Sequence, residues 1–210
     1  MLYGYPLSGK STAAAKIRDY LAKKGEPAEI ISSAKFRLKG RKHGSSKGFV
    51  DEKKESTKRV KDKAYGKLCK RAEICLGSGI TPVLDATFHK YYRRKQVYDL
   101  TNKWKAETYV VWVVFDNEEA IRDGLRKRML AKNVVALHTW KQYSTMASQT
   151  EKVEDHELAQ KLLGVKIIKF DRGKMAIKLY GCVNDSFAEE LARAISASYL
   201  STFPAVLRAT

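Results

Sequence analysis

Cysteine is scarce in this chain of 210 residues, which contains only three, at Cys69, Cys75 and Cys182. Their number is odd and none of them stands in a C-x-x-C spacing, which argues against both a disulfide framework and a zinc site. Free thiols are typical of reducing compartments. We therefore expect three cysteines that pack as small side chains, no zinc, and a cytoplasmic location.

Long apolar runs are also lacking. No stretch of about 18 apolar residues occurs, so we expect no membrane-spanning helix and no membrane partner. The glycine-rich segment that starts at Gly4 leaves no room for a signal peptide. Only three residues precede Gly4, whereas strands usually have about 5–6 residues. The first strand is therefore short, or the natural chain has residues before Met1.

Acidic residues are few relative to basic ones. The chain has 41 Lys and Arg against 23 Asp and Glu, a net charge of +18. Such an excess favours a polyanionic partner, and nucleic acid before an anionic membrane, although a basic surface without a partner remains an alternative. Residues 35–71 concentrate the excess, with 15 basic residues against four acidic ones. Gly, Ser and Lys dominate the first part of this segment, which predicts a mobile basic insertion at about residues 35–60.

The order of predicted elements alternates between strand and helix. Strands are predicted at residues 1–3, 28–32, 80–84, 108–115, 165–170 and 175–180, and helices at 11–24, 52–77, 89–104, 117–132 and from 186 to before Pro204. This alternation predicts one α/β domain over residues 1–210, with a parallel sheet flanked by helices. The run 108–115 is the most apolar and predicts the sheet centre. Residues 171–174 predict a hairpin turn. Residues 133–157 are polar and fit no regular element, so we assign about 118–157 to a lid region.

One segment carries recognisable chemistry. Residues 4–12 read GYPLSGKST and match G-x-x-x-x-G-K-S, the P-loop, after a strand and before an Ala-rich helix. In such a loop the backbone N–H groups turn inward around the β-phosphate, and the helix directs its positive end to the same place. Lys10 reaches the β- and γ-phosphates, and Ser11 offers its hydroxyl to Mg²⁺. The predicted cofactors are ATP or GTP with Mg²⁺, bound by Gly4, Ser8, Gly9, Lys10, Ser11 and Thr12.

A magnesium site also needs a carboxylate from a neighbouring strand. Asp85 directly follows the apolar run Thr81–Leu84, so it is expected at the carboxyl end of a strand, where α/β sheets bind ligands. We interpret Asp85 as the metal acid, which holds Mg²⁺ directly or through water. The alternative is an aspartate that only caps the following segment.

At this point the chain resembles a group of small P-loop kinases that includes O-phosphoseryl-tRNA kinase, the tRNA-dependent ATPase associated with Elongator and phage-type polynucleotide 5′-hydroxyl kinases. The resemblance covers about residues 1–170 and rests on GYPLSGKST, VLDATFHKYYRRK and VVWVVFDNEEAIRDGLRKR. It implies a nucleoside-kinase-like P-loop NTPase fold. It also implies lid arginines after the fourth strand. Phosphoryl transfer needs cations over the oxygens of the moving group, and the candidate catalytic cations are Arg122 and Arg126, which lie four residues apart with Arg128 and Lys132 nearby. A solvated basic helix face is the alternative for these arginines.

The sequence departs from this group at one position. Many of these kinases carry an aspartate after the second strand as general base, but this chain has Ser32, Ser33 and Ala34 there and no acid before Asp51. The acceptor hydroxyl then loses its proton late, or Asp85 acts as the base, or the chain hydrolyses ATP without a phosphate acceptor. The sequence leaves these three alternatives open.

RNA, and tRNA in particular, is the predicted partner. Backbone phosphates attract a chain of this charge, because each neutralised phosphate releases counterions. Aromatic side chains among basic ones suit stacking on unpaired bases. The candidate RNA contacts are Lys35, Arg37, Lys39, Arg41, Lys42, Tyr91, Arg93 and Trp140. The predicted function is a kinase that phosphorylates an RNA hydroxyl; a tRNA-dependent ATPase module and a small-molecule kinase are the alternatives.

Overall fold

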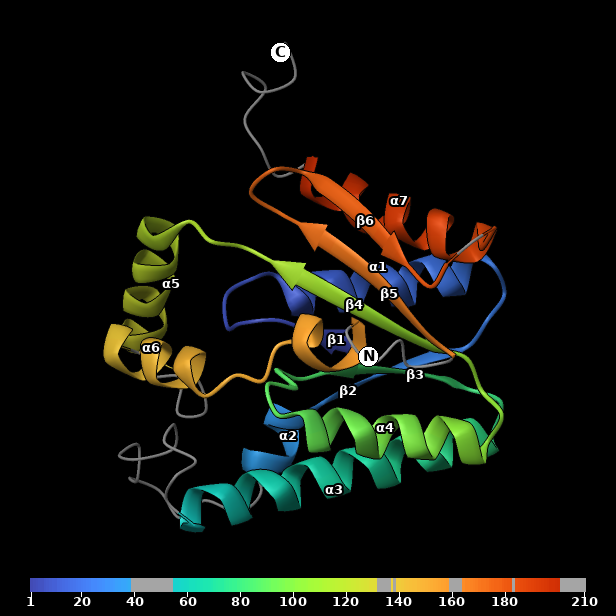
Figure 1. The fold of residues 1–210 in the computed structure, drawn as a ribbon, viewed down its shortest axis with the longest axis horizontal. Helices are drawn as coiled ribbons and strands as arrows, with labels where there is room; N and C mark the ends of the chain where they lie inside the picture. Colours follow the sequence, from blue (N-terminus) through green and yellow to red (C-terminus); the bar gives the residue numbers. More distant parts are fainter. Residues whose placement is uncertain (39–54, 132–136, 138, 159–163, 183, 201–210) are drawn as a thin grey trace.

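The computed structural model describes residues 1–38, 55–131, 137, 139–158, 164–182 and 184–200 (Figure 1). Within these ranges, no helix has both the length and the apolar character needed to cross a bilayer.

Six strands form one sheet in the order β2-β3-β1-β4-β5-β6. Neighbouring strands pair in parallel, except that β6 runs antiparallel to β5. Their bounds are β1 (Leu2–Tyr3), β2 (Ala28–Ser32), β3 (Thr81–Asp85), β4 (Thr108–Val114), β5 (Val165–Asp171) and β6 (Ala176–Tyr180). The predicted α/β class is confirmed, as are the hairpin between the last two strands and the central place of the strand that begins at Thr108.

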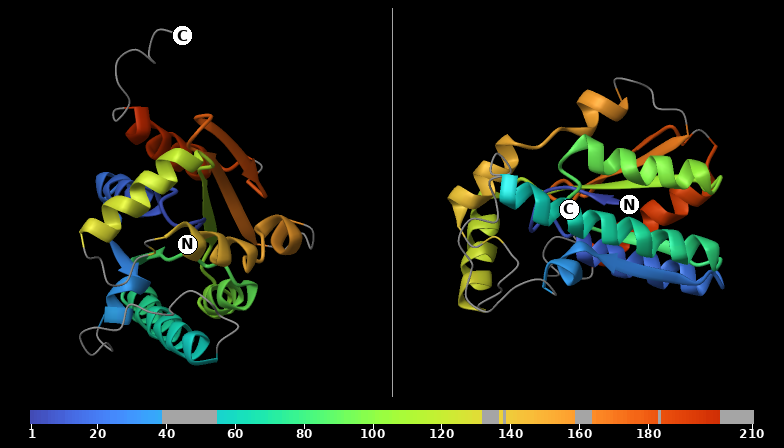
Figure 2. Two further views of the ribbon diagram at one scale, coloured as in Figure 1. Left: turned by 90° about the vertical axis from the view of Figure 1, so that its left-hand side faces the viewer. Right: turned by 90° about the horizontal axis from the view of Figure 1, so that it is seen from below.

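Helices cover both faces of the sheet (Figure 1; Figure 2). Helices α1 (Lys10–Lys23) and α7 (Ser186–Leu200) lie on one face, where Ile17 and Ile195 join one apolar core. Helices α3 (Glu55–Gly77) and α4 (Tyr91–Lys103) lie on the other, where Leu68 and Val97 join a second core. Each helix buries a stripe of apolar side chains at helical spacing. A few charged residues are buried as well, namely Lys10 of α1, Lys61 of α3, and Arg93 and Arg94 of α4.

A third group of elements lies beyond the carboxyl end of β4 (Figure 1). It consists of α5 (Glu118–Leu130) and α6 (Trp140–Ser148). The short π-helix η1 (Glu154–Leu158) follows α6 in the chain and instead packs on the second core through Leu158. The absence of a regular element in 133–157 was a wrong prediction, because α6 lies within that segment. Thr139 and Gln142 form a capping box at the start of α6, in which each side chain accepts a hydrogen bond from the other residue's backbone.

The predicted basic insertion is also more regular than expected. Helix α2 (Ser33–Leu38) follows β2 directly, and α3 already begins at Glu55. Lys35 and Arg37 are therefore helical, contrary to the prediction of a loop from residue 35. The remaining part of the insertion, residues 39–54, lies outside the described residues.

Candidate nucleotide-binding site

The P-loop runs from the end of β1 into α1, and two glycines allow its close packing. Gly4 has a φ of 143°, and a Cβ at this position would lie 2.3 Å from the carbonyl oxygen of Val113. Gly9 has a φ of 105°, and a Cβ there would lie 2.6 Å from the Tyr199 hydroxyl. Both positions combine a left-handed backbone with a close approach, so a side chain at either one would displace the loop.

Lys10 is buried at the start of α1, with 8% of its surface exposed. Its Nζ donates a hydrogen bond to the carbonyl oxygen of Tyr5, at 2.6 Å, within the same loop. Burial lowers the pKa of Lys10 to about 8; Asp85 opposes this shift, and the positive charge of Arg128 adds to it. The amine is thus held inside the loop, where burial favours its neutral form more than in a free lysine.

Asp85 and Ser11 meet at the carboxyl edge of the sheet. β3 pairs in parallel with β1, with Asp85 opposite Leu2, so the end of β3 lies beside the P-loop. The Ser11 hydroxyl donates a hydrogen bond to Oδ2 of Asp85 at 2.8 Å. A hydroxyl and a carboxylate are the oxygen ligands that Mg²⁺ prefers. These two residues fit a magnesium ion bound next to a phosphate.

Ser8 supports this interpretation of the loop. Its hydroxyl oxygen is buried and has no hydrogen-bond partner among the described residues. Buried hydroxyls are normally paired, and an unpaired one costs roughly 1–3 kcal/mol. A phosphate oxygen in the loop is the kind of group that supplies the missing partner.

Side chains of two helices, α3 and α4, form hydrogen bonds with the segment that follows Asp85. The Tyr65 hydroxyl of α3 accepts a hydrogen bond from the Phe88 N–H at 3.0 Å and lies 3.4 Å from the Thr87 hydroxyl. Arg94 of α4 donates to the carbonyl oxygen of Phe88 at 2.9 Å. Phe88 has a φ of 49°, an unusual value for a residue other than glycine. The surrounding side chains therefore fix a backbone conformation that the local sequence does not favour.

A tyrosine from the end of the chain contacts the P-loop. The Tyr199 hydroxyl of α7 donates to the carbonyl oxygen of Gly9 at 2.7 Å, and its ring packs against Phe170. Neither Tyr65 nor Tyr199 was predictable as a site residue, because nothing in the local sequence pattern shows that a distant tyrosine reaches this site.

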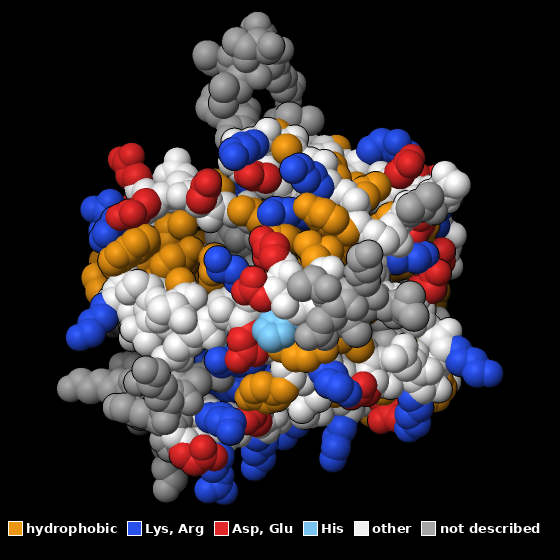
Figure 3. Space-filling view, in the orientation of Figure 1, with side chains coloured by type: hydrophobic (Ala, Val, Ile, Leu, Met, Phe, Trp, Pro, Cys, Tyr) orange, Lys and Arg blue, Asp and Glu red, His pale blue; other side chains and the backbone are white. Residues whose placement is uncertain are grey.

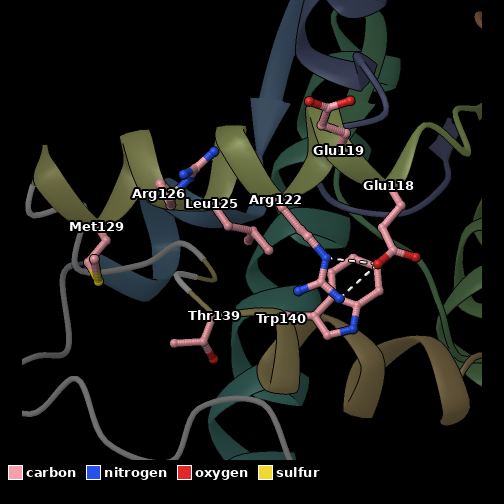
Figure 4. A pocket seen from close by; sticks show the side chains of 8 residues that line it. All are labelled: Glu118, Glu119, Arg122, Leu125, Arg126, Met129, Thr139 and Trp140. Carbon is pink, nitrogen blue, oxygen red and sulfur yellow. Dashed lines mark hydrogen bonds and ion pairs between the residues drawn. The ribbon is translucent and has the colours of Figure 1, made fainter.

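The predicted lid arginines Arg122 and Arg126 lie on α5, beside Trp140 and Thr139 at the start of α6 (Figure 4). Arg122 pairs with Glu118 at 2.7 Å and stacks on the Trp140 ring, 4.0 Å from its centroid. Arg126 is exposed and lies 3.8 Å from Asp123. Both line a groove of about 720 Å³ between α5 and α6. Within the described part of the chain, no hydrogen bond or ion pair joins either arginine to Lys10 or Asp85.

Arg128 differs from these two arginines. Burial lowers the pKa of Arg128, and its charge contributes to the lowered pKa of Lys10. The apolar side of α5 packs on the P-loop itself, since Ile121 and Leu125 share a cluster with Tyr5 and Leu7. Arg128 is therefore the α5 arginine whose charge acts on the P-loop lysine.

The candidate RNA contacts have different environments. Arg93 was a wrong prediction: it is 0% exposed, and its guanidinium pairs with Asp62 at 2.7 Å and lies over the Tyr65 ring. Tyr91 is half-buried and stacks on His156 with ring centroids 4.6 Å apart.

The other candidate contacts are more accessible or are not described. Trp140 is half-buried and stacks on Tyr143. Lys35 is exposed on α2, and Arg37 is half-buried there. Lys39, Arg41 and Lys42 lie outside the described residues.

Solved structures with similar folds were identified. Kti12 from Chaetomium thermophilum, solved with ADP-AlF3, is 16% identical, with a TM-score of 0.58, 94% of this chain covered and 97% of that chain. A kinase-like protein from Chloroflexus aurantiacus is 12% identical, with a TM-score of 0.57 and coverages of 96% and 95%. A structure from the PezAT toxin–antitoxin system of Streptococcus pneumoniae is 17% identical, with a TM-score of 0.51 and coverages of 96% and 85%. At these identities the likeness concerns the fold.

The sequence itself matches a known family. No curated protein sequence matches the chain. Residues 1–150 match the AAA_33 family, which is described as an AAA domain. The matched region contains the P-loop, Asp85 and α5, and the fold is that of small P-loop kinases, as the resemblance implied. The chain therefore belongs to the AAA_33 family of P-loop proteins.

Proposed function

We propose that this protein is an ATP- and Mg²⁺-dependent kinase that transfers the γ-phosphate to a hydroxyl group of RNA, with tRNA as the first substrate to test. The 2.8 Å contact between the Ser11 hydroxyl and the Asp85 carboxylate carries the nucleotide part of the proposal. It joins the P-loop helix to the neighbouring strand at the point where a metal-bound phosphate is expected.

The residues of the loop have distinct roles in this reaction. The Lys10 amine leaves its Tyr5 carbonyl contact and binds the β- and γ-phosphates. Ser11 and Asp85 hold Mg²⁺, which when bound neutralises charge on the phosphate oxygens. The acceptor oxygen forms a bond to the γ-phosphorus while the bond to the bridging oxygen breaks, and ADP leaves. Positioning and electrostatic stabilisation dominate this chemistry, so the acceptor proton is lost to water late in the step.

The charge of the chain supports RNA as the acceptor. The net charge of +18 exceeds what a small alcohol substrate requires, and backbone phosphates neutralise such charge with a gain in affinity. The described cysteines are free thiols, as in proteins of reducing compartments, so we place the reaction in the cytoplasm, where tRNA is abundant.

An RNA-dependent ATPase without a phosphate acceptor is the second candidate. Ser32 ends β2 and Ser33 begins α2, so no carboxylate follows β2 directly. Without a base at this position, water is as good an acceptor as an RNA hydroxyl, and RNA binding then regulates hydrolysis.

Incubation with γ-labelled ATP, Mg²⁺ and bulk tRNA separates these functions. Label in RNA that is absent with Lys10→Ala supports the kinase. Phosphate release that RNA stimulates, without labelled RNA, supports the ATPase. If neither result is obtained and the protein instead phosphorylates a nucleoside or another small alcohol, the RNA proposal is contradicted.

A further inference from the structure

We propose that the outer face of α3 is the surface on which the RNA backbone binds. Four basic residues form this surface, which we call the α3 basic stripe: Arg59, Lys63, Lys67 and Lys70. The inference rests on the proposed function for the identity of the partner, but it moves the binding surface away from the residues that the sequence pattern favoured.

The α3 basic stripe follows one side of the helix. Its members are four, four and three residues apart, so they project from the same side at intervals of roughly one turn. At about 1.5 Å per residue, the stripe is about 16 Å long. The opposite side of α3 carries Leu68, Ala72 and Cys75, which are buried against the sheet. The stripe therefore points directly away from the core.

The charges of this stripe are not neutralised locally. All four residues are exposed, and none has an ion pair or hydrogen bond within the described part of the chain. Acidic neighbours of the stripe on α3 include Glu55, four residues before Arg59, and Asp62, three residues after it; Asp62 pairs with Arg93 of α4. By contrast, Arg71 on the flank of α3 pairs with Glu29 of β2 at 2.5 Å. Lys and Arg side chains projecting from the lower edge of the molecule, over α3 and α4, are visible in Figure 3.

The basic residues of α5 provide the contrast. Arg122 pairs with Glu118, and Lys127 pairs with Asp123 at 2.7 Å. The α5–α6 groove therefore contains its own counter-charges, and its field is weaker than a count of arginines suggests. Long-range attraction of a polyanion requires unpaired charges, which the α3 basic stripe offers in a row.

An oriented aromatic ring lies beside the stripe. The Tyr92 hydroxyl of α4 donates to Oδ1 of Asp62 at 2.6 Å, and Asp62 lies at the edge of the stripe, three residues after Arg59. The Arg93 guanidinium lies 5.1 Å from the centroid of the Tyr92 ring. Tyr92 is 37% exposed. A ring that is fixed at its hydroxyl and still accessible is suited to stacking on an unpaired base.

Charge reversal tests the surface. The variant Arg59→Glu/Lys63→Glu/Lys67→Glu is compared with Lys16→Glu/Lys23→Glu/Lys178→Glu, which has the same net charge but changes exposed residues of α1 and β6. We expect the α3 variant to bind tRNA at least tenfold more weakly at about 0.1 M salt. The slope of log affinity against log salt should fall by about 2 units, because about three phosphate contacts are lost. The control should change both quantities much less, and both variants should bind Mg²⁺–ATP as the parent does.

Three outcomes would overturn the assignment. Equal losses in the two variants would show that only total charge matters. An α3 variant that binds tRNA like the parent would place the RNA elsewhere, for example at the lid. Loss of binding to anionic phosphatidylserine vesicles alone, with tRNA binding intact, would assign the stripe to a membrane surface. If the parent does not bind tRNA at any salt concentration, the proposed function itself fails.

Tyr92 offers a test that does not depend on charge. Tyr92→Ala should weaken binding to a single-stranded RNA about tenfold, because a stacking partner is lost. Tyr92→Phe retains the ring and should bind nearly as the parent does, although it lacks the bond to Asp62. Equal effects of the two substitutions would show that the hydroxyl matters through the fold and would remove stacking from the proposal.

Discussion

At the residue scale, burial changes the acid–base chemistry of the Lys10 amine. Burial lowers its pKa to about 8, so the amine is protonated below that pH and neutral above it. Because the charged form binds phosphates, nucleotide affinity should be highest below pH 8 and fall by up to about tenfold for each pH unit above it. Phosphate groups are ionised throughout that range, since their second pKa is about 6.

Titration calorimetry with ATP between pH 7 and 9.5 measures this dependence. Binding near pH 9 should also take up a proton, which is detected by comparing buffers with different ionisation enthalpies. Lys10→Ala should bind weakly and lose this pH dependence. A parent protein with constant affinity across the range would contradict the role of a buried, titrating lysine.

The lid arginines give a second prediction at this scale. Arg128 influences the charge of Lys10, whereas Arg126 is exposed and borders the groove between α5 and α6. We expect Arg128→Ala to lower kcat by about tenfold or more, because a cation near the transferred phosphate stabilises the transition state. Arg126→Ala, the matched control on the other side of the helix, should lower it less. A larger effect of Arg126→Ala on kcat, with an unchanged KM for ATP, would instead support Arg126 as the arginine that stabilises the transition state.

At the element scale, helix α3 positions the segment that carries Asp85. Its Tyr65 hydroxyl accepts the Phe88 N–H, three residues after the metal acid. Tyr65→Phe removes that acceptor and should raise the Mg²⁺ concentration for half-maximal activity several-fold. The cost in folding free energy should be only about 1 kcal/mol.

The matched control is Tyr20→Phe on α1, whose hydroxyl bonds to Glu190 on α7, far from the Asp85 loop in sequence. It should lower stability by a similar amount and leave the Mg²⁺ dependence unchanged. If both substitutions alter the Mg²⁺ dependence alike, Tyr65 has no positioning role.

Elements with a strong local pattern were predictable from the sequence. The apolar runs at Ala28–Ser32 and Thr108–Val114 became strands with nearly the predicted bounds, since both are flanked by polar residues and turns. Helix α6 was missed because most of its residues are polar, so its sequence lacks a clear apolar stripe at helical spacing. Its start was nevertheless encoded: Thr139 followed three residues later by Gln142 is the pattern of a capping box.

Contacts between distant elements were beyond sequence reasoning. Arg93 follows two tyrosines in a basic segment, which is typical of an RNA-binding surface. The helix register instead turns it inward, where Asp62, 31 residues earlier, neutralises it. Arg94 and Glu157 likewise form an ion pair with both side chains fully buried. Which charges meet depends on the packing of two helices, and a single sequence does not reveal that packing.

At the scale of the whole molecule, the sheet brings one site together from three segments. β1 leads into the P-loop, β3 ends at Asp85 beside it, and β4 leads to α5, which packs on the loop. The alternation of elements predicted this arrangement, because the carboxyl ends of parallel strands meet at one edge. The distribution of charge did not follow from the sequence, since ion pairs neutralise α5 but leave the α3 basic stripe unpaired.

The central claim is that Asp85 and the P-loop bind Mg²⁺ with a nucleotide as one site. ATP affinity with and without Mg²⁺ should be compared in the parent, in Asp85→Asn and in Asp99→Asn. The latter changes an exposed aspartate of α4 that forms an ion pair with Lys95. We expect Mg²⁺ to strengthen ATP binding in the parent and in Asp99→Asn. In Asp85→Asn this gain should fall by about tenfold, because an amide is a poorer ligand for a hard cation. An undiminished Mg²⁺ effect in Asp85→Asn would contradict the account.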